Sequence, residues 1–452
     1  MRLRRTQHKP LLTMQAVGLC TVLYHELMML NFFPLFIFLN MNIIQRLSDK
    51  KEWENFLAYK LGQDGESKQE LQDLQLYVDK EEYIPVVKLI SNGQRLSPPK
   101  KMLISKSGST KKRTVYSFNR EENYLLKFLC FLLKEYDHIF APNLYSFRVD
   151  RGVKNAVERL MNVKNVSSYY VYKVDISSYF NSACVDIVLL ELKKVFEKDK
   201  PLYDFFEGLL KDTRVEFDGE IINENKGILP GVPVANFLAN VYLSQLDFYF
   251  KENKIIYARY SDDIIVFAKT QEQLNSHVAV IKEFLANRKL TINSKKEKVS
   301  LPTEPWDFLG FEYCNGKIDV CEVSLKKIKA KMKRKMRALA RWASRKNLPK
   351  EKAVIAFIKK INAKLYDNPI HNELTWTRWY FPIINTTKGL ESIDAYMQEC
   401  IRFLATGKRT NAKYNFRYQD IKALGYRNLV HEYYRYKNPE NSQSEQEQIK
   451  GN

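Results

Sequence analysis

The sequence predicts an α+β fold in which a mixed central region lies between helical regions. Within residues 168–330, short apolar runs rich in Val, Ile and Tyr alternate with longer stretches that place apolar residues at helical spacing. Residues 45–100 and the chain beyond Ser324 show helical spacing alone. The 452 residues are 45% hydrophobic, which excludes a wholly disordered chain and allows several packed domains.

The net charge is strongly positive. Lys and Arg total 73 against 52 Asp and Glu, which gives a formal charge of +21. A charge of this size favours a polyanionic partner, either a nucleic acid or an anionic membrane face, although it also serves solubility. Six scattered cysteines show no C-x-x-C spacing, so we expect reduced thiols of an intracellular protein and no structural zinc.

Residues 1–40 allow three interpretations. A basic start precedes the apolar stretch 11–39, as in a signal peptide or membrane anchor, but a His-Glu pair and a proline interrupt it. The segment is an extension ahead of a translation start at Met41, a membrane-associated segment, or a helix buried in the fold. We expect a cytoplasmic protein, with membrane association through residues 11–39 left open.

Two carboxylates mark the strongest candidate for chemistry. Residues 255–267 form two apolar runs around a polar turn, which predicts a β-hairpin with Asp262 and Asp263 at its tip. Adjacent carboxylates repel each other unless a cation neutralises them, and Mg²⁺ prefers such oxygen ligands. Taken alone, the pair is equally well explained as a turn exposed to water.

A third carboxylate ends another strand-like run. Asp175 follows the apolar segment 169–174, 87 residues before Asp262, and alone it is also a good helix N-cap. Between the two lies a Gly/Pro loop, residues 226–234, that leads into a helix. Its glycines either form an ordinary connection or let a nucleotide approach the backbone closely.

These segments together resemble the reverse transcriptase family, in particular its bacterial branch related to group II intron and retron enzymes. The matching motifs are, in order, Tyr145–Arg151, Asp175–Phe180, the Gly/Pro loop with Leu-Ala-Asn-x-Tyr-Leu, Tyr260–Asp263, Leu290–Lys296 and Phe308–Phe311. The resemblance covers about residues 100–312, with a weaker echo to residue 436. It implies a right-hand polymerase with fingers, a palm with an antiparallel sheet, and a helical thumb. The domains it predicts are 1–40 (extension), 41–165 (N-terminal helices and fingers), 166–320 (palm), 321–437 (basic helical thumb) and 438–452 (disordered tail).

The resemblance implies a two-metal active site. Asp175, Asp262 and Asp263 would hold two Mg²⁺ ions, with Mn²⁺ as an alternative, and the carbonyl of Ile176 would be a further ligand. Lys296 aligns with a lysine that protonates or neutralises the leaving pyrophosphate, and its neighbours Lys295 and Lys298 are rivals for this role.

Other residues are assigned to the incoming nucleotide. The ring of Phe180 would clash with a 2′-hydroxyl and so favour dNTPs, or it is a core residue. Lys112, Arg113 or the preceding Lys111 would bind the triphosphate, or they form a solvated basic loop. Gly231 would contact the nucleotide, but Leu229-Pro230-Gly231 lacks the Gln of the family's P-Q-G and Ala235-Asn236 replaces a Ser-Pro pair.

The template–primer duplex would lie against the thumb. Residues 326–346 contain eleven Lys or Arg and no acid, and their apolar residues recur at helical spacing, which predicts a cationic amphipathic helix. Lys333, Arg334 and Arg337 are its candidate nucleic-acid contacts. Arg148 is either a buried structural arginine or a template contact, and Phe308 and Phe311 are expected to be packing residues of a primer-grip hairpin.

We therefore expect an RNA-directed DNA polymerase that uses dNTPs, an RNA template and a DNA product. By analogy with free-standing bacterial relatives, the template would be a cognate noncoding RNA and the role anti-phage defence. One alternative is a DNA polymerase that is template-independent or primed by protein, which the altered Gly/Pro loop motivates. Another is a splicing or RNA-binding factor with an idle polymerase site. The sequence does not reveal the oligomeric state.

Overall fold

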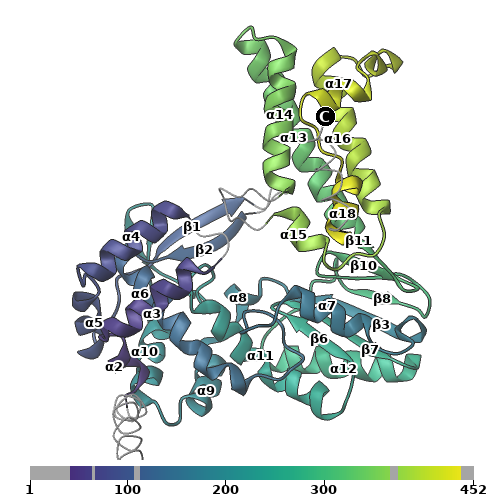
Figure 1. Ribbon diagram of the computed structural model, residues 1–452. Coiled ribbons are helices and arrows are strands. Elements are labelled where there is room, and N and C mark those ends of the chain that lie inside the picture. The colour runs from purple at the N-terminus through teal and green to yellow at the C-terminus, as the bar shows by residue number, and fades with distance from the viewer. Residues whose placement is uncertain (1–40, 64–66, 106–111, 367–374, 439–452) are drawn as a thin grey trace, which may run out of the picture.

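The computed structural model of the protein describes residues 41–63, 67–105, 112–366 and 375–438. The extension predicted at 1–40, and the tail predicted at 438–452 apart from Asn438, lie outside these ranges. In Figure 1 the described elements form an N-terminal lobe, a central sheet with its helices, and a helical C-terminal part that rises from one edge of the sheet. This is the predicted α+β arrangement of fingers, palm and thumb.

The fingers begin with short helices packed around aromatic side chains. The elements are α2 (Ile43–Arg46), α3 (Lys50–Leu61), α4 (Lys68–Asp79), α5 (Ile84–Ser91), β1 (Lys100–Ser105), β2 (Lys112–Ser117), α6 (Arg120–Leu132) and the 3₁₀ helix η1 (Leu133–Ile139). The ring of Trp53 is fully buried, 4.2 Å from the ring of Phe128 and 4.8 Å from that of Tyr83 between centroids. The helical lead-in predicted for residues 45–100 is confirmed up to β1.

The fingers sheet joins segments that are far apart in the chain. Its strand order is β2-β1-β4-β5, with β4 (Arg214–Phe217) and β5 (Glu220–Asn223). β4 and β5 come from the range predicted as palm, so the division at residue 165 is wrong for this hairpin. The free edge of β1 needs a hydrogen-bonding partner. The parallel strand β4 provides it, with Lys100 opposite Glu216.

The palm is a four-stranded antiparallel sheet of order β6-β7-β3-β8. Its elements are α7 (Val153–Met161), η2 (Val166–Ser168), β3 (Tyr170–Asp175), α8 (Tyr179–Ser182), α9 (Val185–Val195), α10 (Lys200–Lys211), α11 (Ala235–Glu252), β6 (Tyr257–Tyr260), β7 (Asp263–Ala268), α12 (Gln271–Asn287) and β8 (Lys298–Ser300). Strand residues alternate between two buried clusters. Tyr172, Val174 and Val266 belong to the large fingers–palm core, whereas Val171 and Phe267 belong to a smaller core on the other face.

The thumb follows a small sheet of order β11-β10-β9. The strands of this sheet are β9 (Trp306–Phe308), β10 (Phe311–Cys314) and β11 (Lys317–Val320). The thumb consists of α13 (Glu322–Arg345), α14 (Lys350–Leu365), α15 (Trp376–Tyr380), α16 (Lys388–Thr406), η3 (Asn411–Asn415), α17 (Tyr418–Ala423) and α18 (Leu429–Lys437). α13 buries Ile328, Met332, Met336 and Leu339 in a core shared with α14 and α16. The cationic amphipathic helix predicted at 326–346 is therefore confirmed.

Two further observations concern the described ranges alone. The cysteines placed there are free thiols, as expected. In the same ranges, no helix combines the length and apolar character needed to cross a bilayer.

Candidate active site

The predicted carboxylate hairpin is present and its register brings two aspartates face to face. β6 and β7 pair up to Tyr260 opposite Asp263, and Ser261 turns the chain with a left-handed φ of 59°. Asp263 is the first residue of β7 and pairs with Asp175, the last residue of β3. Directly opposed residues of antiparallel strands project to the same face of a sheet, so both carboxylates lie on one side. Asp262 lies next to them in the turn.

The three carboxylates interact electrostatically. Asp175 is only 4% exposed. Burial raises the pKa of Asp262, and the charge of Asp175 raises it further. Burial and then the charge of Asp262 raise the pKa of Asp263 to about 6. Burial and mutual repulsion therefore make Asp262 and Asp263 harder to ionise than exposed aspartates.

Lys296 is the lysine that contacts this cluster. Its Nζ lies 2.5 Å from Oδ2 of Asp175, and Asn293 Nδ2 donates to Oδ1 of the same aspartate at 3.1 Å. Burial lowers the pKa of Lys296, but the hydrogen bond and charge of Asp175 outweigh burial and leave it raised. Lys298 pairs instead with Asp307 at 3.4 Å. Contact with the aspartates thus separates Lys296 from its rival Lys298.

A buried polar network, not predicted from the sequence, holds the turn from behind. Ser146 Oγ accepts the N–H of Ser261 at 2.8 Å and donates to Asn240 Oδ1 at 3.2 Å. The guanidinium of Arg259 donates to the carbonyl of Ser261 at 3.2 Å and forms a fully buried ion pair with Asp247, Nη2 to Oδ2 2.6 Å. These residues fix the backbone that carries Asp262.

Two residues of this network, Ser146 and Asn240, lie within sequence motifs that point to the family. Ser146 lies within the segment Tyr145–Arg151, and Asn240 within Leu-Ala-Asn-x-Tyr-Leu, so both belong to motifs of the resemblance. Arg259 stands in an otherwise apolar strand, where a charged residue demands a partner. The identity of that partner, Asp247, depends on how α11 packs on β6.

The glycines of the Gly/Pro loop lie against the backbone of neighbouring segments. A Cβ at Gly227 would lie 2.2 Å from the carbonyl oxygen of Phe180, and the N–H of Ile228 donates to that oxygen at 2.9 Å. A Cβ at Gly231 would meet the carbonyl of Tyr116 at 2.8 Å, and its φ is +99°. Both glycines are therefore required by close backbone approach within the protein. Contact of Gly231 with a nucleotide stays a prediction.

Phe180 is half-buried at the start of α8 beside its fully buried neighbour. Tyr179 is 2% exposed and donates from its hydroxyl to the carbonyl of Ala239 at 2.6 Å, which gives it a structural role. The rings of Tyr179 and Phe180 meet edge to face at 5.5 Å between centroids. The exposed part of Phe180 stays the candidate for sugar selection.

The basic residues at the start of β2 are assigned to the triphosphate, and the charge of one of them acts on Asp262. Lys112 and Arg113 are both exposed at the start of β2, and Lys111 lies outside the described residues. The charge of Arg113 lowers the pKa of Asp262, opposing the rise caused by burial. Arg113 is therefore within electrostatic reach of the aspartates.

Arg148 is a structural arginine. Its guanidinium forms an ion pair with Asp137, Nη2 to Oδ2 2.7 Å, and donates to the carbonyls of Asp137, Phe140 and Ala141. All its N–H groups face acceptors of the protein, since Nε donates to Asp137 as well. The alternative of a template contact is therefore wrong in this conformation, because no donor is left for a phosphate.

The remaining candidates belong to the small sheet β11-β10-β9 and to the thumb helix α13. Phe308 and Phe311 are each 1% exposed and face each other across β9 and β10, so both pack as predicted. Lys333, Arg334 and Arg337 are exposed on α13, as predicted for nucleic-acid contacts, and that role stays a prediction.

The donor set suits a hard cation shared with a substrate. Within the described ranges, no three His, Cys, Asp or Glu side chains lie close enough to enclose a metal ion. Mg²⁺, however, is commonly held by one or two carboxylates together with substrate phosphates and water. The raised pKa values of Asp262 and Asp263 indicate that this cluster would gain from such a cation. Ile176 is buried, and its N–H donates to the carbonyl of Asp262 at 3.2 Å.

An antiparallel palm sheet with Asp175 opposite Asp263, flanked by a fingers sheet and a helical thumb, defines a right-hand polymerase fold. Residues 104–313 match the reverse transcriptase (RNA-dependent DNA polymerase) family. This part of the chain is therefore a reverse transcriptase domain.

One curated relative is the Retron Ec86 reverse transcriptase of Escherichia coli. It is 26% identical over 165 residues, which are 33% of this chain and 52% of that protein. The chain thus spans about half the length of this relative.

Similar solved structures include three telomerases, each 11% identical to this chain. Apo telomerase of Candida tropicalis without its C-terminal domain has a TM-score of 0.39, covering 50% of this chain and 56% of that one. Telomerase of Candida albicans in complex with a TWJ fragment of telomeric RNA has a TM-score of 0.40, covering 77% and 68%. Apo telomerase of Candida tropicalis has a TM-score of 0.42, covering 73% and 60%.

Proposed function

We propose that this protein is an RNA-directed DNA polymerase that adds dNTPs to a primer 3′ end. The observation that carries this is the register of the palm sheet, which sets Asp175 opposite Asp263 with Asp262 in the adjoining turn. The carboxylates repel one another, so they favour binding of a metal cation that relieves this repulsion. The nucleotide would bind together with that cation. The match to the reverse transcriptase family supports the choice of template.

In the proposed reaction the primer 3′-oxygen bonds to the α-phosphorus of the dNTP, and the bond to the bridging oxygen breaks to release pyrophosphate. Two Mg²⁺ ions, held by Asp175, Asp262 and Asp263 with the Ile176 carbonyl, would activate the hydroxyl and neutralise the leaving group. The ammonium of Lys296, now 2.5 Å from Asp175, can donate a proton or hydrogen bond to the departing phosphate.

Other side chains would position the substrate. Arg113 and Lys112, exposed on β2, would bind the triphosphate from the fingers side. The half-buried ring of Phe180 would exclude a 2′-hydroxyl. Exposed cations of α13 would contact the phosphates of the template–primer duplex.

The test is primer extension on an RNA template with dNTPs and Mg²⁺. The wild-type protein should extend the primer, and Asp262→Ala/Asp263→Ala should lose extension while keeping its thermal unfolding transition. The matched control, Asp186→Ala/Asp204→Ala, removes two exposed acids from α9 and α10 and should retain activity. Equal extension by the Asp262/Asp263 double variant would refute the site.

The altered Gly/Pro loop favours one alternative, a polymerase that works without a template or primes on protein. Gly231 has no neighbouring Gln, and its environment is set by contacts with Tyr116. Sequencing of the product separates the alternatives, because templated synthesis copies the RNA supplied. DNA covalently attached to the protein would instead establish protein priming. RNA binding without any incorporation would indicate a splicing or RNA-binding factor with an idle site.

The template and setting are proposed from the likeness to a retron reverse transcriptase. We propose a cognate noncoding RNA as template and a role in defence against phage. Sequencing of nucleic acids that co-purify with the protein, from cells with and without phage, tests both. A single enriched RNA joined to or paired with cDNA is expected, whereas a random RNA population would contradict the proposal.

A further inference from the structure

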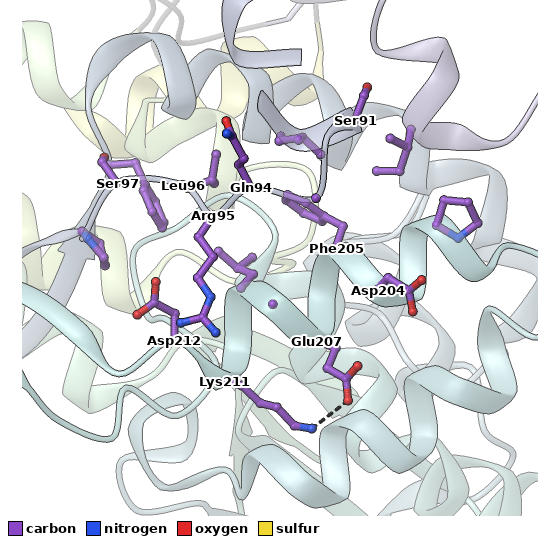
Figure 2. A pocket seen from close by; sticks show the side chains of 18 of the residues that line it. Ser91, Gln94, Arg95, Leu96, Ser97, Asp204, Phe205, Glu207, Lys211 and Asp212 are labelled. Atoms are coloured by element: carbon purple, nitrogen blue, oxygen red, sulfur yellow. Dashed lines mark hydrogen bonds and ion pairs between the residues drawn. The ribbon is translucent and has the colours of Figure 1, made fainter. Parts of the chain in front are cut away.

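A cavity of about 570 Å³ lies between α5 and the segment leading to β1 on one side and α10 on the other (Figure 2). Its walls include the apolar side chains of Ile90, Leu96, Phe118 and Phe205. A volume of this size, lined by apolar groups with a few polar ones, is typical of small-molecule sites. None of the residues assigned to the polymerase site lines it.

The acids around the cavity are neutralised by partners within the protein. Each acid forms an ion pair of 2.6–2.7 Å: Asp204 with Lys200, Glu207 with Lys211, and Asp212 with Arg214. Figure 2 shows the pair between Lys211 and Glu207 at the lower rim of the cavity. These acids are therefore engaged in direct ion pairs, although the charge of Asp212 also acts on Lys226 and raises its pKa.

Two cations lack such a partner. Lys226 is 4% exposed, and its Nζ donates to the carbonyl of Arg214 at 3.3 Å, which uses one of three donors. Burial lowers the pKa of Lys226, as expected for an ammonium that costs desolvation energy. Arg95 makes no hydrogen bond or ion pair with any residue of the described ranges. In Figure 2 it extends from the segment before β1 toward the Asp212 side of the cavity.

We propose that this cavity binds a nucleoside monophosphate at a site separate from the polymerase site. Arg95 and Lys226 supply the positive charge that a phosphate needs. Phe118 and Phe205 supply apolar surface for a base. Because each acid already has an ion-pair partner, Arg95 and Lys226 remain available to an anionic ligand, and their charges act more strongly in a partly buried cavity than in water.

The binding test uses the full chain in EDTA, so that the palm aspartates carry no divalent ion. Isothermal titration with AMP should give saturable binding to one site. Adenosine lacks the phosphate and inorganic phosphate lacks the base, so each should bind at least about tenfold more weakly than AMP. Absence of saturable AMP binding up to millimolar concentration, or phosphate binding as tightly as AMP, would overturn the proposal.

Variants locate the site. Arg95→Ala should weaken AMP binding about tenfold or more, whereas Lys88→Ala, which removes an exposed cation from α5 outside the cavity, should not change it. Gly208→Leu should abolish binding with both cations in place, because Gly208 lines the cavity and a Cβ there meets no atom within 4 Å. A leucine also favours the helix over glycine, so folding should persist.

Two results would count against this location. AMP binding by Gly208→Leu at the wild-type affinity would place the ligand elsewhere. Loss of AMP binding in Asp262→Ala/Asp263→Ala would assign it to the polymerase site. The double variant is expected to bind AMP as the wild type does. AMP binding at the cavity can therefore be established or refuted whether or not the protein proves to be a polymerase.

Discussion

Arg259 and Asp247 form a fully buried ion pair, with Nη2 and Oδ2 2.6 Å apart, and the same guanidinium donates to the carbonyl of Ser261. The pair therefore connects α11 to the turn that carries Asp262. A charge in such a place is stable only while its partner is present.

Asp247→Asn should lower the free energy of unfolding by about 3–5 kcal/mol, because it leaves the charge of Arg259 buried without compensation. Urea unfolding measures the change. The control is Asp204→Asn, which breaks the exposed pair with Lys200 and should leave the free energy of unfolding nearly unchanged. Equal losses in both variants would show that the buried pair does not stabilise the turn.

Lys296→Met should reduce the maximal rate of primer extension by about 10²-fold or more, since it removes the candidate proton donor beside Asp175. Single-turnover kinetics with saturating dNTP separates this effect from weaker nucleotide binding. Lys298→Met, whose parent lysine pairs with Asp307, should keep a rate near that of the wild type. If the two variants slow extension equally, the role of Lys296 is not specific.

Phe180→Ala should admit rNTPs, because the half-buried ring that would meet the 2′-hydroxyl is gone. The ratio of kcat/KM for dNTP and rNTP measures the change. Phe180→Tyr retains the ring and should retain the preference for dNTPs. An unchanged ratio in Phe180→Ala would mean that this ring only packs against Tyr179.

Asp263→Asn should stabilise the metal-free protein by about 1–3 kcal/mol at neutral pH. The pKa of Asp263 is raised from 3.8 to about 6, so the folded state binds more protons than the unfolded state between these values. The free energy of unfolding of the wild type should therefore fall as pH rises from about 4 to 6 and stay lower above that. Urea unfolding in EDTA across this range checks the sign.

The control for this pH dependence is Glu283→Gln, which removes an exposed acid from α12 and should leave the wild-type profile intact. The Asp263→Asn profile should be flatter than both. If the free energy of unfolding of the wild type does not fall between pH 4 and 6 relative to that of Asp263→Asn, the raised pKa is contradicted.

Replacing Lys333, Arg334 and Arg337 by Gln should weaken binding of a template–primer duplex and reduce the slope of log K against log salt by about 2–3, near 0.9 for each phosphate that the helix no longer neutralises. Fluorescence anisotropy at several salt concentrations measures both. The control is Lys68→Gln with Lys88→Gln, which removes exposed cations of the fingers helices. An unchanged slope in the α13 variant would exclude this helix from the duplex interface.

Local sequence patterns were sufficient for the fold class, the carboxylate hairpin and the cationic helix. Two apolar runs on either side of the polar turn at Ser261–Asp263 specify a hairpin with its strands buried in the core. The spacing of Ile328, Met332 and Met336 specifies a buried helical face in the same way. Each of these signals is carried by neighbours in the chain.

The tertiary structure alone decided which distant residues meet. The pairing of β3 with β7 sets Asp175 opposite Asp263, and the packing of α11 selects Asp247 as the partner of Arg259. It also assigned Arg148 to Asp137 and gave β1 a partner from within the predicted palm. A sequence states which groups need a partner, because burying a charge or a strand edge is costly. Only the packed chain determines which partner is within reach.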